Sequence, residues 1–394
     1  MNSGFKVKFD VLSSYLPTGI FASLSTVNVY LVGGPVRDFL LNKDFFDIDL
    51  VVERWDDKFI ENLILALTPQ KVSRSGFLTL KIILKNFEVD IAHAREEFYD
   101  YPGALPRVNP SYDILCDLRR RDFTVNSMAI RIYPQPFTLI DQLDGYGDLR
   151  SRILRVNKRD SFKDDPTRSF RAIRYKHRLN LKYSYETLRE FENARYFIRN
   201  VSFERIRREL QKIAKEKKRV DIFLEISDSG ILSSWDQRFS FGDKTLLTKL
   251  DEFLPYEERN WLFFLLPFGI LNYFEGNPDK FTSAEKKSLQ KILRKKPAGE
   301  FSPGSLYKIL KDMTPEEVKV WGLLNDIDER VINEYLKQIS STVPVLGLKD
   351  ILRFTNDPLE ARLAYETYVS MLIDGKVPQG KDEEIVKKIL KKIF

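Results

Sequence analysis

The stretch VYLVGGPVRDFLLNKDFFDIDLVVE, residues 29–53, decides the fold class of this chain. Its first four residues, 29–32, are apolar or aromatic and predict a buried strand. A Gly-Gly-Pro break at 33–35 ends that strand, and residues 36–41 predict a helix. Residues 46–53 predict a second strand. A strand, a tight glycine turn, a helix and another strand in this order indicate a small α+β unit.

Two aspartates lie two positions apart on the second predicted strand. Because side chains at i and i+2 of a strand share a face, Asp47 and Asp49 are expected side by side. Such a pair is costly unless a cation neutralises it, and carboxylates are ligands that Mg²⁺ prefers. We predict that the pair binds two Mg²⁺ ions, which would activate an attacking hydroxyl and steady a leaving phosphate in catalysis. The alternative is a solvated acidic edge strand. Asp90, on a later predicted strand, is the candidate third carboxylate or equally a salt-bridge partner.

The glycine turn is predicted to hold phosphate. Gly33 and Gly34 allow the backbone to approach a phosphate closely, and the N-terminus of the following helix points at it. Arg37, one turn into that helix, is expected to reach the same phosphates.

The rest of the first 150 residues keeps this mixed character. An amphipathic helix is predicted over 55–67, and strands over 78–84 and 87–92 are predicted to form a hairpin. Residues 96–118 contain three prolines, Gly103 and mixed polar residues, so we predict a long functional loop there.

After residue 150 the pattern becomes helical. Helices are predicted over 165–179, 185–194, 203–215, 220–226 and 382–394, with breaks at 255, 267, 276–278, 297–304 and 344–347. The predicted fold class is therefore α+β: a small head with a β-sheet and helices, followed by an all-helical neck, body and tail. The predicted bounds of these four parts are 1–150, 151–216, 217–300 and 301–394.

Composition excludes several classes of protein. With one cysteine, Cys116, and two histidines, His93 and His177, an internal disulfide is impossible and a Cys/His zinc site is nearly excluded. The first ten residues contain no apolar signal region, and no stretch is apolar enough to span a bilayer, so a cytoplasmic location without a membrane partner is expected. A net charge of +7 mildly favours a polyanionic partner.

Several segments together resemble the polymerase-β-type nucleotidyltransferases of the class II CCA-adding branch, in the tRNA nucleotidyltransferase and poly(A) polymerase family. The first is the glycine turn with the Asp-Ile-Asp strand. RRDFTVN at 120–126 is similar to the family's RRDFTxN motif, and DDPTRSFRAIRY at 164–175 to its nucleotide-selecting motif, although the family more often has Glu at position 164. SFERI at 202–206, followed by Glu209-Leu210, resembles a later helix-stabilising motif. The resemblance covers residues 29–210.

The residues of the nucleotide-selecting motif suggest how a base and a triphosphate could be recognised. Asp165 and Pro166 predict the N-cap and first position of a helix, on which Arg168, Arg171 and Arg174 drift slowly around one face. Three such arginines suit a triphosphate. An aspartate that accepts from an exocyclic amine and an arginine that donates to a ring nitrogen fit both cytosine and adenine and exclude uracil and guanine. We predict these roles for Asp165 and Arg168; the alternative is a helix cap and arginines paired with neighbouring acids.

The resemblance implies the reaction and its partners. It implies transfer of two CMP and one AMP from CTP and ATP to tRNA 3′ ends, with Mg²⁺ and release of pyrophosphate. It also implies that Arg121 and Asp122 position the sugar and phosphates, and that the segment at 94–106 is a flexible element tied to the last nucleotide added. Candidate contacts with the tRNA acceptor arm are Lys215, Lys217, Lys218, Lys295, Lys296, Lys387, Lys388, Lys391 and Lys392.

Other activities on the same fold stay open at this point. The chain could add only CC or only A, or be a poly(A) polymerase, because these enzymes share the template pair. A catalytically inactive RNA-binding protein is the rival from another class.

Overall fold

The computed structural model describes residue 16 and residues 27–45, 47–75, 79–134, 137–295 and 302–393. The chain forms two compact units. The N-terminal unit comprises Met1–Ser240 and Tyr256–Trp261, and the C-terminal unit comprises Phe241–Pro255 and Leu262–Phe394. The N-terminal unit contains both the predicted head and the predicted neck, so the finer division into four parts stays a prediction. Phe46, Leu78, Lys296 and Phe394, which belong to predicted elements or contacts, lie outside the described residues.

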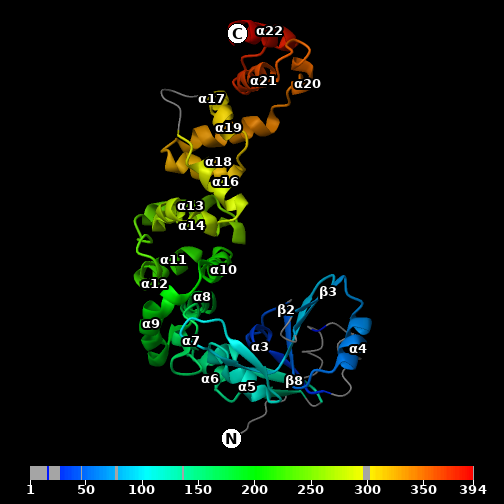
Figure 1. Ribbon diagram of the computed structural model, residues 1–394, viewed down its shortest axis with the longest axis vertical. Coiled ribbons are helices and arrows are strands. Elements are labelled where there is room, and N and C mark those ends of the chain that lie inside the picture. Colours follow the sequence, from blue (N-terminus) through cyan, green and yellow to red (C-terminus); the bar gives the residue numbers. More distant parts are fainter. Residues whose placement is uncertain are drawn as a thin grey trace. The chain divides into compact units, whose positions relative to one another are not determined.

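A seven-stranded sheet forms the head of the N-terminal unit (Figure 1). Its spatial order is β3-β4-β5-β2-β1-β8-β9. The strands are β1 Val29–Val32, β2 Asp47–Val52, β3 Lys71–Ser75, β4 Thr79–Ile83, β5 Glu88–His93, β8 Ala129–Tyr133 and β9 Thr138–Ile140. Strand β2 pairs parallel with β5 and antiparallel with β1, and β4 pairs antiparallel with β5. The two strands and the hairpin predicted from the sequence are thereby confirmed.

Apolar side chains are buried on both faces of the sheet, since Val51, which shares the face of the aspartates, also belongs to a buried cluster. Ile48 and Leu50 are buried, whereas Asp47, which alternates with them, is exposed. The predicted amphipathic helix is α4 Asp57–Leu67, which begins after Asp56 caps it by accepting from the backbone nitrogens of Lys58 and Phe59. The helix after the glycine turn is α3 Gly34–Leu40. The alternation of Ile48 and Leu50 with the two aspartates and the amphipathic pattern of α4 are strong local signals, and both predictions are confirmed.

The long loop predicted at 96–118 is wrong. This segment forms an antiparallel hairpin of β6 Arg95–Phe98 and β7 Arg107–Pro110, followed by α5 Ile114–Arg119. None of the eight strand positions is buried and five of them are polar, so no apolar alternation marks the strands in the sequence. The hairpin turn contacts the helical region: Gly103 has a φ of 80°, and a Cβ there would lie 2.9 Å from the Cβ of Asn200.

The rest of the N-terminal unit is mainly helical. Its elements are η1 Thr124–Asn126, α6 Gly145–Arg150, β10 Ile153–Leu154, α7 Ser161–Asp164, α8 Arg168–Leu179, β11 Lys182–Tyr183, α9 Tyr185–Phe197, η2 Ile198–Asn200, α10 Phe203–Ala214, α11 Arg219–Asp228, α12 Ile231–Trp235 and η3 Glu258–Asn260. The four helices predicted here are confirmed, with one correction at a boundary. Asp165 is not the N-cap of α8: its backbone is extended, and Thr167 occupies that position.

Edge-to-face aromatic contacts join the head to these helices. The Phe123 ring contacts the rings of Phe162 and Tyr175, and the Phe162 ring contacts that of Phe191. Phe123 and Phe162 are completely buried. The RRDFTVN segment, which carries Phe123, is thus fixed against α7 and α8, and this packing brings two motifs that are far apart in sequence to one site.

A half-buried carboxylate, that of Glu225, links α8 to α11. Glu225 accepts from Lys176 Nζ at 2.6 Å, from His177 Nε2 at 2.6 Å and from Tyr183 OH at 2.7 Å. Burial raises the pKa of Glu225, but these three hydrogen bonds outweigh it and lower the pKa to about 2. Because the pKa in the folded state lies below the ordinary value, the stabilisation is present above about pH 4.5 and is lost as the pH falls towards 2.

We expect Glu225→Gln to flatten the acid dependence of stability. Between pH 6 and pH 3 the wild type should lose about 2 kcal/mol more unfolding free energy than the variant. Urea unfolding followed by tryptophan fluorescence measures this. In a Trp321→Phe background the remaining Trp55, Trp235 and Trp261 all belong to the N-terminal unit and report on it alone. Equal acid dependence in both proteins would contradict the prediction.

The C-terminal unit is all-helical among its described residues. Its elements are α13 Lys244–Phe253, α14 Trp261–Phe264, which starts at the last residue of the N-terminal unit, η4 Leu266–Phe268, α15 Ile270–Gly276, η5 Pro278–Lys280, α16 Ser283–Ile292, α17 Pro303–Leu310, α18 Pro315–Leu324, α19 Glu329–Ser341, α20 Leu348–Ile351, α21 Pro358–Ile373 and α22 Asp382–Ile393. The break predicted at 297–304 is too long, because Pro303 and Gly304 form the first turn of α17, where proline is tolerated.

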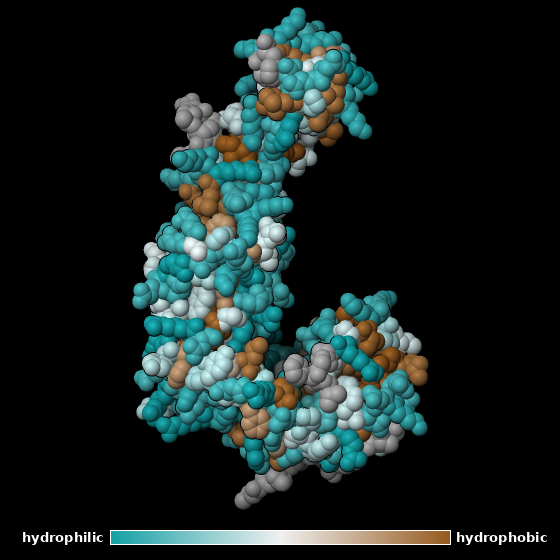
Figure 2. Space-filling view, in the orientation of Figure 1, coloured by the Kyte–Doolittle hydropathy of each residue, from teal (hydrophilic) through white to brown (hydrophobic). Residues whose placement is uncertain are grey.

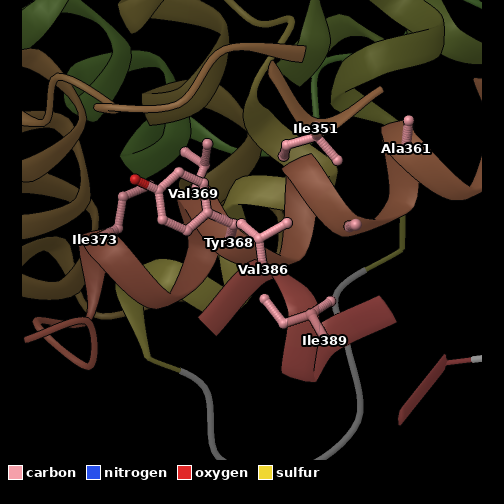
Figure 3. Packing of buried hydrophobic residues seen from close by; sticks show 8 residues of the cluster. Ile351, Ala361, Tyr368, Val369, Ile373, Val386 and Ile389 are labelled. Carbon is pink, nitrogen blue, oxygen red and sulfur yellow. The ribbon is translucent and has the colours of Figure 1, made fainter. Parts of the chain in front are cut away.

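Two apolar clusters stabilise these helices. Trp321 is buried with Leu306 and Tyr335. Tyr368 and Val386 belong to a second cluster, which joins α20, α21 and α22 (Figure 3). The face of the molecule in Figure 2 is mainly hydrophilic, with scattered hydrophobic residues. None of the described helices is both long and apolar enough to cross a membrane.

Candidate active site

A pocket of about 390 Å³ in the N-terminal unit collects most of the predicted site residues. The glycine turn, β2, the β6–β7 hairpin, the RRDFTVN segment and the start of α8 all contribute to it. The predicted residues that line it are Gly33, Gly34, Asp49, Arg121, Asp122, Asp165, Arg168 and Arg171. Glu97, Tyr99, Pro106, Arg120, Asn126 and Tyr175 also line it and were not predicted. Asp47, Asp90, Arg37 and Arg174 are not among its lining residues.

The carboxylates of the head lie on neighbouring strands. Asp49 is in register with Asp90 on β5, and Asp90 is in register with Lys81 on β4. The pKa of Asp49 is raised to about 6: burial raises it most, the nearby charge of Arg121 opposes this, and the charges of Asp90 and Asp47 raise it as well. Burial likewise raises the pKa of Asp90. A second positive charge beside Asp49 would relieve this repulsion, as expected for a cation site.

The two strand carboxylates fit a hard divalent ion such as Mg²⁺, for which the chain would supply only some of the ligands. Among the described residues, no group of three or more His, Cys, Asp or Glu side chains is placed to hold a metal. Two carboxylates on one strand face, Asp47 and Asp49, nevertheless match the way in which proteins bind Mg²⁺, with one or two carboxylates and the remaining ligands from water and substrate phosphates.

The glycine turn lies directly against the pocket. Gly33 has a φ of 72°, and a Cβ there would lie 2.8 Å from Nη1 of Arg121 and 3.8 Å from Oδ2 of Asp49. A side chain at this position would therefore be strained by its backbone and would also displace the guanidinium. The turn, Arg121 and Asp49 form one wall of the pocket.

Arg37 lies behind this wall instead of in the pocket. It is 3% exposed, donates to Oδ1 of Asn126 at 2.6 Å, and pairs with Asp38 at 2.9 Å. Its guanidinium also lies 5.5 Å from the centre of the Tyr175 ring. Arg37 therefore contacts two residues that line the pocket, Asn126 and Tyr175, and its own contact with phosphate stays a prediction.

Asp117 is a site residue that the sequence motifs did not reveal. This completely buried carboxylate accepts from Arg120 Nη2 at 2.7 Å and from Arg121 Nη2 at 2.8 Å. Burial raises its pKa, but the two guanidinium groups outweigh this and lower it. Asp117 therefore binds the guanidinium groups of two arginines that line the pocket. Its signal in the sequence is weak: an acid three and four residues before two arginines on a short helix.

We expect Asp117→Asn to weaken catalysis and stability together. The amide keeps the volume but removes the carboxylate that pairs with both guanidinium groups, which leaves Arg120 with Glu97 alone. We therefore expect kcat/KM to fall about 10- to 100-fold and stability to fall by about 3 kcal/mol. Steady-state kinetics and urea unfolding measure the two effects. The matched control is Asp113→Asn, which removes the carboxylate that caps α5 at an exposed position. Similar kinetics for both variants would contradict the role of Asp117.

The arginines of α8 separate into different environments. Arg171 Nε donates to Asp122 Oδ2 at 2.7 Å, and burial raises the pKa of Asp122 while Arg171 and Arg168 lower it overall. Arg174 pairs with Glu216 at 3.4 Å, away from the pocket. Each step of three residues rotates the side-chain direction around the helix axis by about 60°. Arg174 therefore points about 120° away from Arg168. The alternative of arginines paired with neighbouring acids thus describes Arg174 and, in part, Arg171.

Asp165 and Arg168 are held rigidly with donor and acceptor capacity to spare. Oδ1 of Asp165 accepts from the backbone and hydroxyl of Thr167 and from Arg205 Nη2 at 2.7 Å. Arg168, 5% exposed, donates to Ser161 Oγ at 2.7 Å and to the backbone oxygen of Arg120 at 2.9 Å. Among the described residues, Oδ2 of Asp165 and Nε of Arg168 have no hydrogen-bond partner.

The comparisons with known proteins agree with this geometry. Residues 29–155 match the poly A polymerase head domain. An A-adding tRNA nucleotidyltransferase of Halalkalibacterium halodurans is 31% identical over 89% of this chain and 85% of its own length. One from Aquifex aeolicus is 28% identical over 93% of this chain, which spans 43% of that relative.

Solved structures show the same fold. A CCA-adding enzyme in an apo form has a TM-score of 0.76 at 26% identity and covers 98% of this chain and 97% of its own. A Thermotoga maritima CCA-adding enzyme complexed with tRNA has a TM-score of 0.72 at 25% identity and covers 99% of this chain and 97% of its own. From the head domain, the site and these full-length similarities, the chain belongs to the tRNA nucleotidyltransferase family, which contains A-adding and CCA-adding enzymes.

Proposed function

We propose that this protein adds CCA to tRNA 3′ ends from CTP and ATP without a nucleic-acid template. The observation that carries the proposal is the pocket in which Asp49, the glycine turn and the Asp165–Arg168 pair converge. The 3′-hydroxyl of the RNA loses its proton to solvent, and its oxygen attacks the α-phosphorus of the nucleotide. The bond from the α-phosphorus to the oxygen that bridges to the β-phosphorus breaks, and pyrophosphate leaves. Relatives named for this activity and solved as complexes with ATP and CTP support the proposed substrates.

The residues of the chain bind and orient the nucleotide. Asp47 and Asp49 would hold Mg²⁺, which, when bound, lowers the cost of charge on the attacking and leaving oxygens. Arg121 and Arg171 would bind triphosphate oxygens, and Asp122, besides pairing with Arg171, would accept from a ribose hydroxyl. Among the lysines predicted to contact tRNA, Lys215, Lys387 and Lys388 pair with glutamates in the structure.

Addition of A alone is the second candidate. It is favoured by the names of the relatives that align over nearly the whole chain, which are A-adding enzymes.

Incorporation of labelled CTP and ATP into tRNA transcripts tests both candidates. The transcripts end before CCA, after C and after CC. Addition of CCA to the first transcript would support the complete activity, and A added only to the transcript that ends in CC would establish the second candidate. No incorporation into any transcript would refute both.

A further inference from the structure

A second pocket lies on the helical side of the N-terminal unit. It has a volume of about 600 Å³ and shares no lining residue with the first pocket. The end of α9 and the adjoining η2 form it, next to α12 (Figure 1). Its lining residues are Glu192, Arg195, Tyr196, Phe197, Arg199 and Asn200, and none of them takes part in the proposed transfer. We call it the α9 pocket.

The two arginines of the α9 pocket donate hydrogen bonds to backbone oxygens, but no carboxylate among the described residues pairs with their charges. Arg195 Nη1 donates to the backbone oxygen of Ser229 at 3.4 Å, and Arg199 Nε donates to that of Ser234 at 3.1 Å. Neither forms a salt bridge with any acid among the described residues, in contrast to Arg120 and Arg171 of the first pocket. Both guanidinium groups keep donors for an anion, and their fork geometry suits phosphate.

An exposed aromatic ring lies beside these arginines. The side chain of Tyr196 is 76% exposed, and its ring contacts Phe197 edge to face at 4.8 Å between centroids. Tyr185, at the start of the same helix, is 71% exposed, with Arg189 over its ring at 5.9 Å. Open aromatic rings interleaved with arginines are the surface on which the bases of single-stranded nucleic acids stack.

Charge and hydrogen bonding favour RNA over an apolar partner. Two arginines face one glutamate in the lining, and Lys163 lies 5.9 Å from the Phe197 ring, so the pocket is net positive. No aliphatic side chain is among its described lining residues. Nδ2 of Asn200 donates to the backbone oxygen of Pro102 at 2.7 Å, which fixes the amide and leaves Oδ1 to accept from a base amine or a sugar hydroxyl.

We propose that the α9 pocket binds a nucleotide of a single-stranded RNA segment. The phosphate lies between Arg195 and Arg199, and the base stacks on Tyr196. This contact is separate from nucleotide transfer in the first pocket and does not require it.

Binding of a fluorescein-labelled ten-nucleotide oligouridylate to the full chain tests this proposal. Uridine is used because the proposed template in the first pocket disfavours it. We expect Tyr196→Ala combined with Arg199→Ala to weaken binding about tenfold or more. The slope of log Kd against log salt should fall by about 0.7 for the lost phosphate contact. Tyr196→Phe alone, which keeps the ring and both arginines, should retain most of the affinity.

The matched control is Tyr112→Ala combined with Arg208→Ala, which removes an exposed ring and an exposed arginine elsewhere in the same unit. Its affinity should equal that of the wild type, and melting temperatures check that each variant is folded. Unchanged affinity in the Tyr196 and Arg199 variant would overturn the proposal. So would UMP binding as tightly as the oligonucleotide with the same dependence on these residues. Incorporation of CTP and ATP, measured in parallel, reports on the first pocket alone.

Discussion

Replacing Asp47 and Asp49 together by asparagine is expected to lower nucleotide incorporation at least about a thousandfold while the fold survives. Both carboxylates share one face of β2, and the pKa of Asp49 is raised to about 6 by burial and by its acidic neighbours. The amides keep the volume but lose the charge that would hold a divalent cation. Because the substitution also removes repulsion with Asp90, the folded state should be as stable as the wild type or more stable.

Two measurements separate this result from misfolding. Incorporation of labelled CTP and ATP gives the activity, and titration with Mn²⁺ followed by its electron paramagnetic resonance signal gives the affinity for metal. The matched control is Glu88→Gln, which removes an exposed carboxylate in register with Asp47 and paired with Lys81. It should retain activity. Activity within tenfold of the wild type in the double variant would refute the assignment of the catalytic carboxylates.

Replacing Asp165 by alanine is expected to reduce the preference for CTP over UTP about 10- to 100-fold. The free Oδ2 of this carboxylate would accept from the exocyclic amine of cytosine or adenine, and uracil and guanine present a carbonyl at that place. Loss of the carboxylate removes both its attraction for the amine of cytosine and its repulsion of the carbonyl of uracil. Competition between labelled CTP and UTP on one tRNA transcript measures the ratio of kcat/KM directly.

Two controls separate base reading from local structure. Arg205→Ala removes the ion pair with Oδ1 of Asp165 but keeps the carboxylate, so it should lower activity more than it lowers discrimination. Arg174→Ala removes an arginine of the same helix that pairs with Glu216, so discrimination should not change. An unchanged ratio in Asp165→Ala would show that the base is selected elsewhere.

The sequence predictions are accurate where neighbouring residues determine the structure, and fail where contacts between distant residues determine it. Local patterns of neighbouring residues predict the strand, glycine turn, helix and Asp-x-Asp strand. The observed bounds of these elements lie within one or two positions of the predicted ones. The β6–β7 hairpin was missed because none of its strand side chains is buried, so no apolar alternation marks it. Asp165 was placed as a helix cap from its proline neighbour, whereas Arg205, forty residues later, is one of its partners.

The sequence by itself determined the fold class, the pair of strand carboxylates and the segments that supply the pocket, because periodicity and short motifs act over a few residues. Only the tertiary structure decided which of the three α8 arginines face the pocket, that Arg37 lies behind it, and that Asp117 is buried between two guanidinium groups. Those outcomes depend on contacts between residues distant in sequence, and on the burial that makes an unpaired charge costly; neither is encoded in any local pattern.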